Sequence, residues 1–269
     1  MKRMLVNLTI GLGLLSVIVG SCYLFISAKT KTCHKDASPK SITACSFLIN
    51  CPFSDSWRAE FLLRRAWQYS TIDSYKEGIK DFNVLLNLNE TKKVSLTAKE
   101  MSVVYGSLAI LNFKLHNDEE ALKYVNISIQ NGSKEPEFYM LKSEINIKRK
   151  EYSKALMNLK IAENFKFNKP ELYFNFGVVY SAMGKYDEAY RNLKKVDANK
   201  YAPNEILRYN KLLGISAYKL SLYEEAREAF QKVLDKGYDP ECAKALSDID
   251  KYLGTTQIRL PKTKIEVNK

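Results

Sequence analysis

Histidine is scarce in this sequence, and the common catalytic motifs are missing from it. The two histidines, His34 and His116, do not stand in the spacing of a metal site or a catalytic triad. There is also no glycine-rich phosphate loop, no G-x-S-x-G turn and no H-E-x-x-H motif. Acidic pairs such as Asp187-Glu188 fall at expected helix starts, where carboxylates suit the helix dipole. We therefore expect no enzymatic activity, no cofactor and no bound metal.

Arginine is also scarce relative to lysine, which carries most of the formal net charge of +12. A basic excess of this size is compatible with nucleic acid or with anionic lipid as a partner. However, no basic run is interleaved with aromatic residues, as a base-stacking surface would require. The sequence therefore predicts a lysine-rich solvated surface or proximity to anionic lipid, and it does not predict nucleic-acid binding.

A long apolar segment follows the basic start Met1-Lys2-Arg3 and extends from Leu5 to Ser27. A helix that rises 1.5 Å per residue can span a bilayer core of roughly 30 Å over this length. Residues 1–28 are therefore predicted to be an uncleaved signal anchor, a signal peptide cut near Ile26-Ser27-Ala28, or a lipoprotein signal ending at Cys22. These alternatives stay open, and the orientation is ambiguous because basic residues flank the segment on both sides.

Cysteines are few, and three of the five lie close together, at Cys33, Cys45 and Cys51. Their spacing lacks the paired C-x₂₋₄-C pattern of a zinc site. A disulfide in an oxidising compartment explains the cluster better than unrelated reduced thiols in a linker. From the residues alone, Cys33 can pair with Cys45 or with Cys51. Cys242, in an expected C-terminal helix, is predicted to be a buried structural thiol.

Segments of the type Tyr-x-x-Ala-x-x-x-Leu recur through the rest of the chain. Their small residues are Gly78, Ala121, Ala155, Ala189 and Ala226, which are 43, 34, 34 and 37 positions apart. A second set of small residues precedes these by twelve positions, at Ala66, Ala109, Ser143, Gly177 and Gly214. A small side chain on one helix lets the next helix approach closely. The pattern predicts five helix pairs, with insertions near residues 89–97 and 199–203.

Thirty-four residues is the period of tetratricopeptide (TPR) repeats, and residues 172–189 are similar to the TPR consensus. The resemblance implies an all-α TPR solenoid of about five helix-turn-helix repeats behind an N-terminal transmembrane or signal helix. The expected segments are a cysteine-containing linker with an extra helix at 29–54, repeats spanning 55–239 (about 55–90, 98–132, 135–169, 170–203 and 204–239), a capping helix at 240–254 and a basic tail at 255–269.

Residues 33–89 resemble a group of exported bacterial TPR proteins more closely. These begin with a Cys and continue with a helix of the type Ile-x-x-Cys-Thr-x-Leu-Ile, which here reads Ile42-Thr43-Ala44-Cys45-Ser46-Phe47-Leu48-Ile49. Ser46 stands in place of the usual Thr. The resemblance implies export, a disulfide between Cys33 and Cys45, and an extra helix at 40–50 packed on the first repeat. It implies no catalytic activity.

TPR solenoids expose the first helix of each repeat on a concave face, which implies a groove for an extended or helical peptide. Counted in phase from the fourth repeat, the residues expected on this face are Arg64, Trp67, Ile110, Phe113, Met140, Glu144, Phe174, Asn175, Val178, Ile215 and Tyr218. In TPR proteins an Asn at the place of Asn175 often contacts the peptide backbone. Packing between repeats is the alternative role for each of these residues.

These features predict a scaffold of the bacterial envelope. It would be anchored in the inner membrane, or released to the periplasm if its signal is cleaved, and it would bind segments of other proteins during assembly of an envelope complex. The alternative is a periplasmic holdase-like chaperone linked to protein export. A scaffold is expected to hold one stoichiometric partner, whereas a chaperone is expected to hold many substoichiometric ones.

Overall fold

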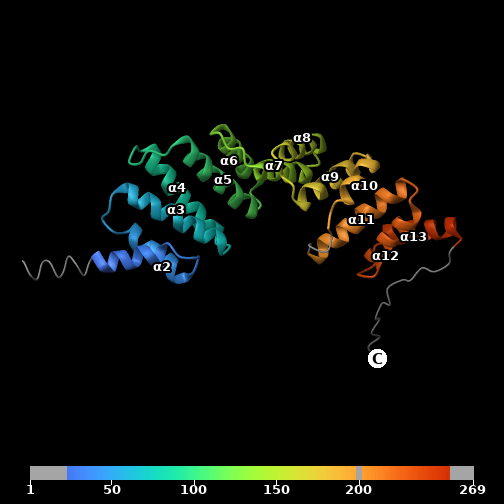
Figure 1. Cartoon of the computed structure of the whole chain (residues 1–269), viewed down its shortest axis with the longest axis horizontal. Coiled ribbons are helices and arrows are strands. Elements are labelled where there is room, and N and C mark those ends of the chain that lie inside the picture. Colours follow the sequence, from blue (N-terminus) through green and yellow to red (C-terminus); the bar gives the residue numbers. More distant parts are fainter. Residues whose placement is uncertain (1–22, 198–201, 255–269) are drawn as a thin grey trace, which may run out of the picture. The chain divides into compact units, whose positions relative to one another are not determined.

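The computed structural model describes residues 23–197 and 202–254, and the regular elements within these ranges are helices. A helical segment at residues 23–33 comes first. The helices that follow are α2 (Pro39–Ile49), α3 (Asp55–Thr71), α4 (Tyr75–Glu90), α5 (Ala98–Lys114), α6 (Asp118–Gln130), α7 (Pro136–Lys148), α8 (Tyr152–Asn164), α9 (Pro170–Ala182), α10 (Tyr186–Leu193), α11 (Pro203–Lys219), α12 (Tyr223–Leu234) and α13 (Pro240–Leu253) (Figure 1).

Two of the predicted segments fall largely or wholly outside these ranges. They are the apolar segment at residues 1–28, of which only 23–28 are described, and the basic tail at 255–269. Of the helices that the structure describes, none is both long enough and apolar enough to cross a bilayer.

The chain divides into two compact units, the first ending at Lys134 and the second beginning at Glu135. The first unit contains α2 to α6, and the second contains α7 to α13. The repeat spacing predicts one continuous array, so the division into units is a feature that the spacing alone does not reveal.

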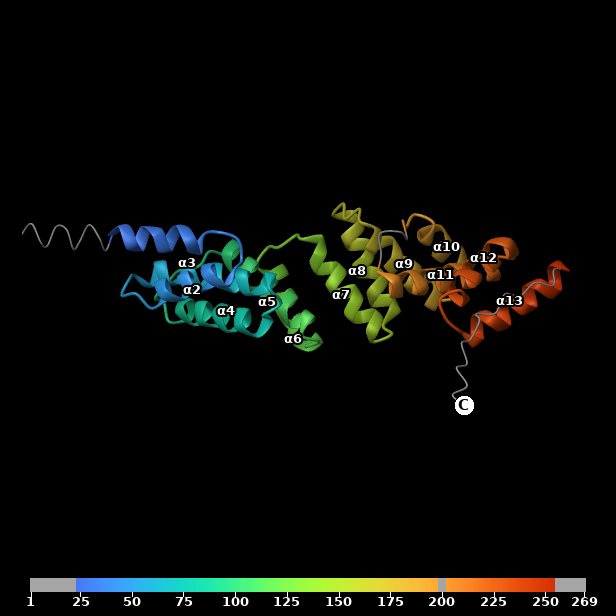
Figure 2. The same ribbon diagram turned by 90° about the horizontal axis from the view of Figure 1, so that it is seen from below.

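Five pairs of consecutive helices pack against each other, and they are α3 with α4, α5 with α6, α7 with α8, α9 with α10, and α11 with α12 (Figure 1). Helix α2 packs on α3 as an additional helix, and α13 packs on α12. The helical segment at 23–33, drawn in blue in Figure 2, lies beside α2, with Phe25 in edge contact with Phe47.

The turn inside each helix pair has the same backbone conformation. One residue takes a positive φ two positions before the second helix, and these residues are Asp73, His116, Lys150, Gly184 and Ser221. The next amide bonds back five residues, as from Lys185 to the carbonyl oxygen of Tyr180 at 2.9 Å. This is the Schellman ending of a helix, in which a left-handed residue satisfies the last carbonyl groups.

Lys150 is a non-glycine residue that takes this left-handed conformation, with φ of 60°. The left-handed region costs an L-residue roughly 1–2 kcal/mol, which exceeds the entropic cost of glycine. We expect Lys150→Gly to raise the free energy of unfolding by about 0.5 kcal/mol, measured by urea denaturation. Lys148→Gly, at the end of helix α7, serves as the control and is expected to lower it. Equal losses in both variants would contradict this assignment of strain.

The predicted small residues lie where paired helices approach most closely. A Cβ atom at Gly177 would lie 2.6 Å from the Cγ of Leu193, and one at Gly214 would lie 2.7 Å from the Cε1 of Phe230. Ala66 is fully buried in the equivalent place in the first pair. The close approach of the two helices therefore depends on the absence of a larger side chain at these positions.

Gly177→Ala is expected to destabilise the second unit by about 1–3 kcal/mol, because the added methyl group overlaps the Cγ of Leu193, close to the backbone of that residue. This loss should exceed the gain of about 1 kcal/mol that alanine brings to a helix. Gly237→Ala is the matched control, because no atom lies within 4 Å of the Cβ that it would add. The melting temperatures of the two variants are compared by thermal unfolding. A melting temperature of Gly177→Ala that is no lower than that of Gly237→Ala would contradict the close packing at Gly177.

Candidate functional site: a groove in the first unit

The segment between α4 and α5 is the insertion predicted near residues 89–97, and it folds back on its own helices. The amide of Leu96 donates a hydrogen bond to the Oδ1 of Asn89 at 2.8 Å. The amide of Val94 donates to the carbonyl oxygen of Leu88. The side chains of Val94 and Leu96 pack on the hydrophobic core of the first unit. The insertion therefore forms an ordered wall.

Helix α5 begins directly after this wall with a capping box. The Thr97 hydroxyl accepts a hydrogen bond from the Glu100 amide, and Glu100 Oε2 accepts one from the Thr97 amide at 2.8 Å. Hydrogen bonds that the Thr97 amide and the Thr97 hydroxyl donate to this carboxylate hold the pKa of Glu100 below its usual range. The capping box fixes the direction in which α5 leaves the insertion.

A groove of about 650 Å³ lies in the first unit and is lined by α3, α4, α5 and the insertion. The apolar side chains that line it include Leu63, Trp67, Leu85, Val94, Leu96 and Val103. Trp67 and Val103 are 44% and 43% exposed, although both are large apolar residues. Glu60, Lys99 and Glu100 also line the groove. The groove thus offers apolar anchor positions with a few charges, which suits binding of a peptide segment.

Among the predicted groove residues of the first unit, Trp67 lines this groove and the others do not. Arg64 is half-buried on α3, and its Nε is buried without a hydrogen-bond partner in the part of the chain that the structure describes. On α5, Ile110 is 41% exposed and Phe113 is half-buried.

In the second unit, several predicted groove residues are core residues. Met140 is 4% exposed and belongs to a cluster with Leu159. Phe174 and Val178 pack with Leu193, and the Arg208 guanidinium lies 5.5 Å from the centre of the Phe174 ring. For these residues the structure shows the packing role that the sequence analysis offered as the alternative.

The remaining predicted residues of the second unit are more accessible. Asn175 and Glu144 are half-buried. Ile215 and Tyr218 line a smaller groove of about 220 Å³ between α11 and α13, together with Cys242. Burial raises the pKa of the Cys242 thiol to about 12, so it stays protonated and unreactive at neutral pH.

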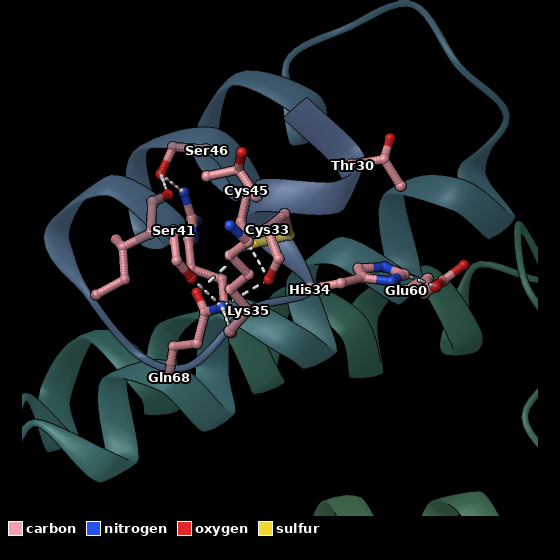
Figure 3. Close-up of a disulfide and its surroundings, with 12 residues drawn as sticks. Thr30, Cys33, His34, Lys35, Ser41, Cys45, Ser46, Glu60 and Gln68 are labelled. Atoms are coloured by element: carbon pink, nitrogen blue, oxygen red, sulfur yellow. Dashed lines mark hydrogen bonds and ion pairs between the residues drawn. A yellow bond between two sulfur atoms is a disulfide. The ribbon is translucent and has the colours of Figure 1, made fainter. Parts of the chain in front are cut away.

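A disulfide joins Cys33 to Cys45, the pairing that the family resemblance implied, and both cysteines are fully buried (Figure 3). Gln68 on α3 holds the loop that this bond closes. Its Nε2 donates to the carbonyl oxygen of Cys33 at 2.7 Å and to the hydroxyl of Ser41. The role of Gln68 was not predicted from the sequence, although a glutamine within the buried face of an amphipathic helix is a signal for such a contact.

A second polar contact between helices is made by Arg65. Arg65 stands where TPR repeats usually have an apolar residue. In the structure its Nε and Nη2 donate to the two carboxylate oxygens of Asp81 at 2.7 and 2.6 Å, and its Nη1 donates to the Ser46 hydroxyl at 2.8 Å. Hydrogen bonding to Asp81 raises the pKa of Arg65. Arg65 therefore links α3 with α4 and with α2.

The fold is that of solved TPR proteins, whereas no protein-family profile and no curated protein sequence match the chain. The C-terminal part of a TPR protein from Cytophaga hutchinsonii matches with a TM-score of 0.55 at 16% identity, over 79% of this chain and 80% of that one. A TPR protein from Parabacteroides merdae matches with a TM-score of 0.54 at 11% identity, over 80% of each chain. YrrB, a TPR protein with an unusual peptide-binding site, matches with a TM-score of 0.53 at 17% identity, over 71% of this chain and 91% of that one. The chain is thus similar to TPR proteins in fold.

Proposed function

We propose that the chain is a protein-interaction scaffold that binds an apolar segment of another protein in the groove of its first unit. The observation that carries this proposal is the exposure of Trp67 and Val103 within a groove that is lined by further apolar residues and a few charged ones. Large apolar side chains that stay exposed together usually mark a binding surface, and tryptophan is enriched among residues that dominate binding energy.

The proposal also places the first unit outside the cytosol, on a membrane anchor formed by residues 1–28. Two observations support it. The apolar run from Leu5 to Ser27 is long enough to span a bilayer. The Cys33–Cys45 disulfide, six residues beyond this run, is of a kind that persists in oxidising compartments. The role that fits both features is a scaffold for assembly of an envelope complex, with the TPR units in the periplasm.

The binding half of the proposal is tested by photo-crosslinking in intact cells. A benzoylphenylalanine at Val103 is expected to give one predominant, stoichiometric protein adduct. The same probe at Ile72, which is also 43% exposed but does not line the groove, is the matched control. A ladder of many weak adducts at Val103 would favour the holdase-like chaperone instead. Equal adducts at Val103 and Ile72 would remove the groove from the function.

The location half is tested by thiol labelling of Cys33 and Cys45 in intact cells, with and without reductant. The outer barrier is first made permeable to a membrane-impermeant thiol reagent. We expect this reagent to label both cysteines only after reduction. Labelling as free thiols only after the inner membrane is opened would place the first unit in the cytosol and overturn this half of the proposal.

A further inference from the structure

The outer face of the helical segment at 23–33 and of α2 carries exposed aromatic side chains. Phe25 and Phe47 are 52% and 40% exposed. Phe25 and Phe47 meet edge-to-face with ring centres 5.5 Å apart, and the Lys29 ammonium lies 5.4 Å from the first ring and 5.8 Å from the second. We call Phe25, Phe47 and Lys29 the aromatic–lysine surface.

The part of the sequence that carries this surface has charged residues almost entirely of one sign. Lys31, Lys35 and Lys40 lie close to these residues in the sequence, and all three are exposed. Asp36 is the one carboxylate residue between residues 23 and 54. Aromatic rings that stay accessible next to lysines are the composition of a surface that lies at the boundary between lipid headgroups and acyl chains. Lysine ammonium groups there are attracted by anionic headgroups.

The two elements that carry this surface are held together. The helical segment at 23–33 ends at Cys33, which is bonded to Cys45 on α2. Gln68 on α3 then fixes the loop through the Cys33 carbonyl oxygen and the Ser41 hydroxyl. Ile26, on the same helical segment, packs on the core of the first unit. Phe25 and Phe47 are therefore presented as one rigid patch.

We propose that the aromatic–lysine surface rests on an anionic lipid headgroup layer, so that the first unit lies against the membrane. This inference rests on the proposed membrane anchor, because its apolar run continues into the helical segment at 23–33 and so brings Phe25 to the headgroup end of the anchor. The disulfide then fixes the angle at which the chain leaves the membrane, and the lysines select a surface that contains anionic lipid.

The full chain is tested in nanodiscs that contain phosphatidylglycerol and phosphatidylcholine. A benzoylphenylalanine at Phe47, and separately at Phe25, should form lipid adducts on irradiation, and the same probe at Trp67 is the control of similar exposure. We expect lipid adducts at Phe47 and Phe25 to exceed those at Trp67 by about tenfold. Lys29→Glu should lower the adduct yield at Phe47 by about fivefold, as should discs of phosphatidylcholine alone.

Co-purification of the chain with the nanodisc reports on the anchor separately. A chain that does not co-purify contradicts the anchor, and the present inference falls with it. A chain that co-purifies but gives no more lipid adduct at Phe47 and Phe25 than at Trp67 keeps the anchor and overturns the inference alone. Protein adducts in place of lipid adducts at Phe47 would also overturn it, since the surface would then be a protein interface.

Discussion

Removal of the Cys33–Cys45 disulfide is expected to lower the stability of the first unit by about 3 kcal/mol, whereas the second unit should keep its stability. The bond closes a loop with a sequence separation of 12 and so restricts the unfolded chain. In the folded state both cysteines are fully buried, and the loop is fastened to α3 by Gln68. Freeing the loop also removes the covalent link between the helical segment at 23–33 and α2.

Hydrogen exchange resolved along the chain measures this effect for each unit in one experiment. The full-length Cys33→Ala/Cys45→Ala variant should lose protection in α2 and α3 and retain it in α9 and α11. Cys51→Ser is the matched control, because Cys51 is a free cysteine outside the disulfide and only partly buried. Unchanged protection of α2 and α3 in the double variant would show that the disulfide contributes nothing to the first unit.

Asp81→Ala is expected to destabilise the first unit by about 3–5 kcal/mol, the range for breaking a buried ion pair from one side. The side chains of Arg65 and Asp81 are 18% and 6% exposed, so the guanidinium left behind would lose both of its carboxylate hydrogen bonds in a largely desolvated place. Urea denaturation of the full chain, followed by the fluorescence of Trp57 and Trp67, reports on the unit that contains the pair.

Replacing both partners separates the ion pair from the loss of packing. The variant Arg65→Met/Asp81→Leu keeps most of the volume and leaves no unpaired charge, so we expect it to be within about 1 kcal/mol of the natural protein. A double variant as unstable as Asp81→Ala would contradict this explanation. The loss of stability would then come from side-chain packing at this helix contact and not from the unpaired guanidinium.

The helix pairs were predictable because small residues leave a strong periodic signal. Gly177 and Gly214 stand where a second helix comes within contact distance of the backbone, and a larger residue there would collide with Leu193 or Phe230. The same sequence signal covers the first helix pair, where Ala66 is fully buried and a Cβ atom at Gly78 would lie 3.1 Å from the carbonyl oxygen of Ala66. Local spacing thus carries the information needed to pair the helices.

The groove was predictable only in part. The helical phase, counted along the first helix of each repeat, predicted that Trp67 lies on an accessible face, and Trp67 is 44% exposed in the structure. The same counting placed Met140 and Phe174 there, yet both are buried. Helical phase gives the direction of a side chain, but not how closely the neighbouring helices cover it. The insertion was visible as an excess of nine positions over the 34-residue period, but its fold-back depends on Val94 and Leu96 finding the core.

The polar contacts of the first unit were not predictable from spacing. Arg65 and Gln68 make their bonds to residues 16 and 35 positions away in the chain, to Asp81 and to Cys33. Neither helical period nor composition indicates which distant partner such a side chain will meet. A polar residue on an otherwise apolar face is nevertheless a useful signal that a specific partner exists.

The central claim is that the groove of the first unit binds a protein segment through Trp67, and a pair of tryptophan variants tests it most directly. Trp67 and Trp57 lie on the same helix and are 44% and 46% exposed. Of the two, only Trp67 lines the groove, whereas the Trp57 ring makes a tilted contact with Phe53 and an edge contact with Phe61. The dissociation constant for the partner crosslinked at Val103 is measured by calorimetry with the full chain. We expect Trp67→Ala to weaken binding by about 30-fold and Trp57→Ala to leave it nearly unchanged. Equal affinity of the two variants for the partner would contradict the claim.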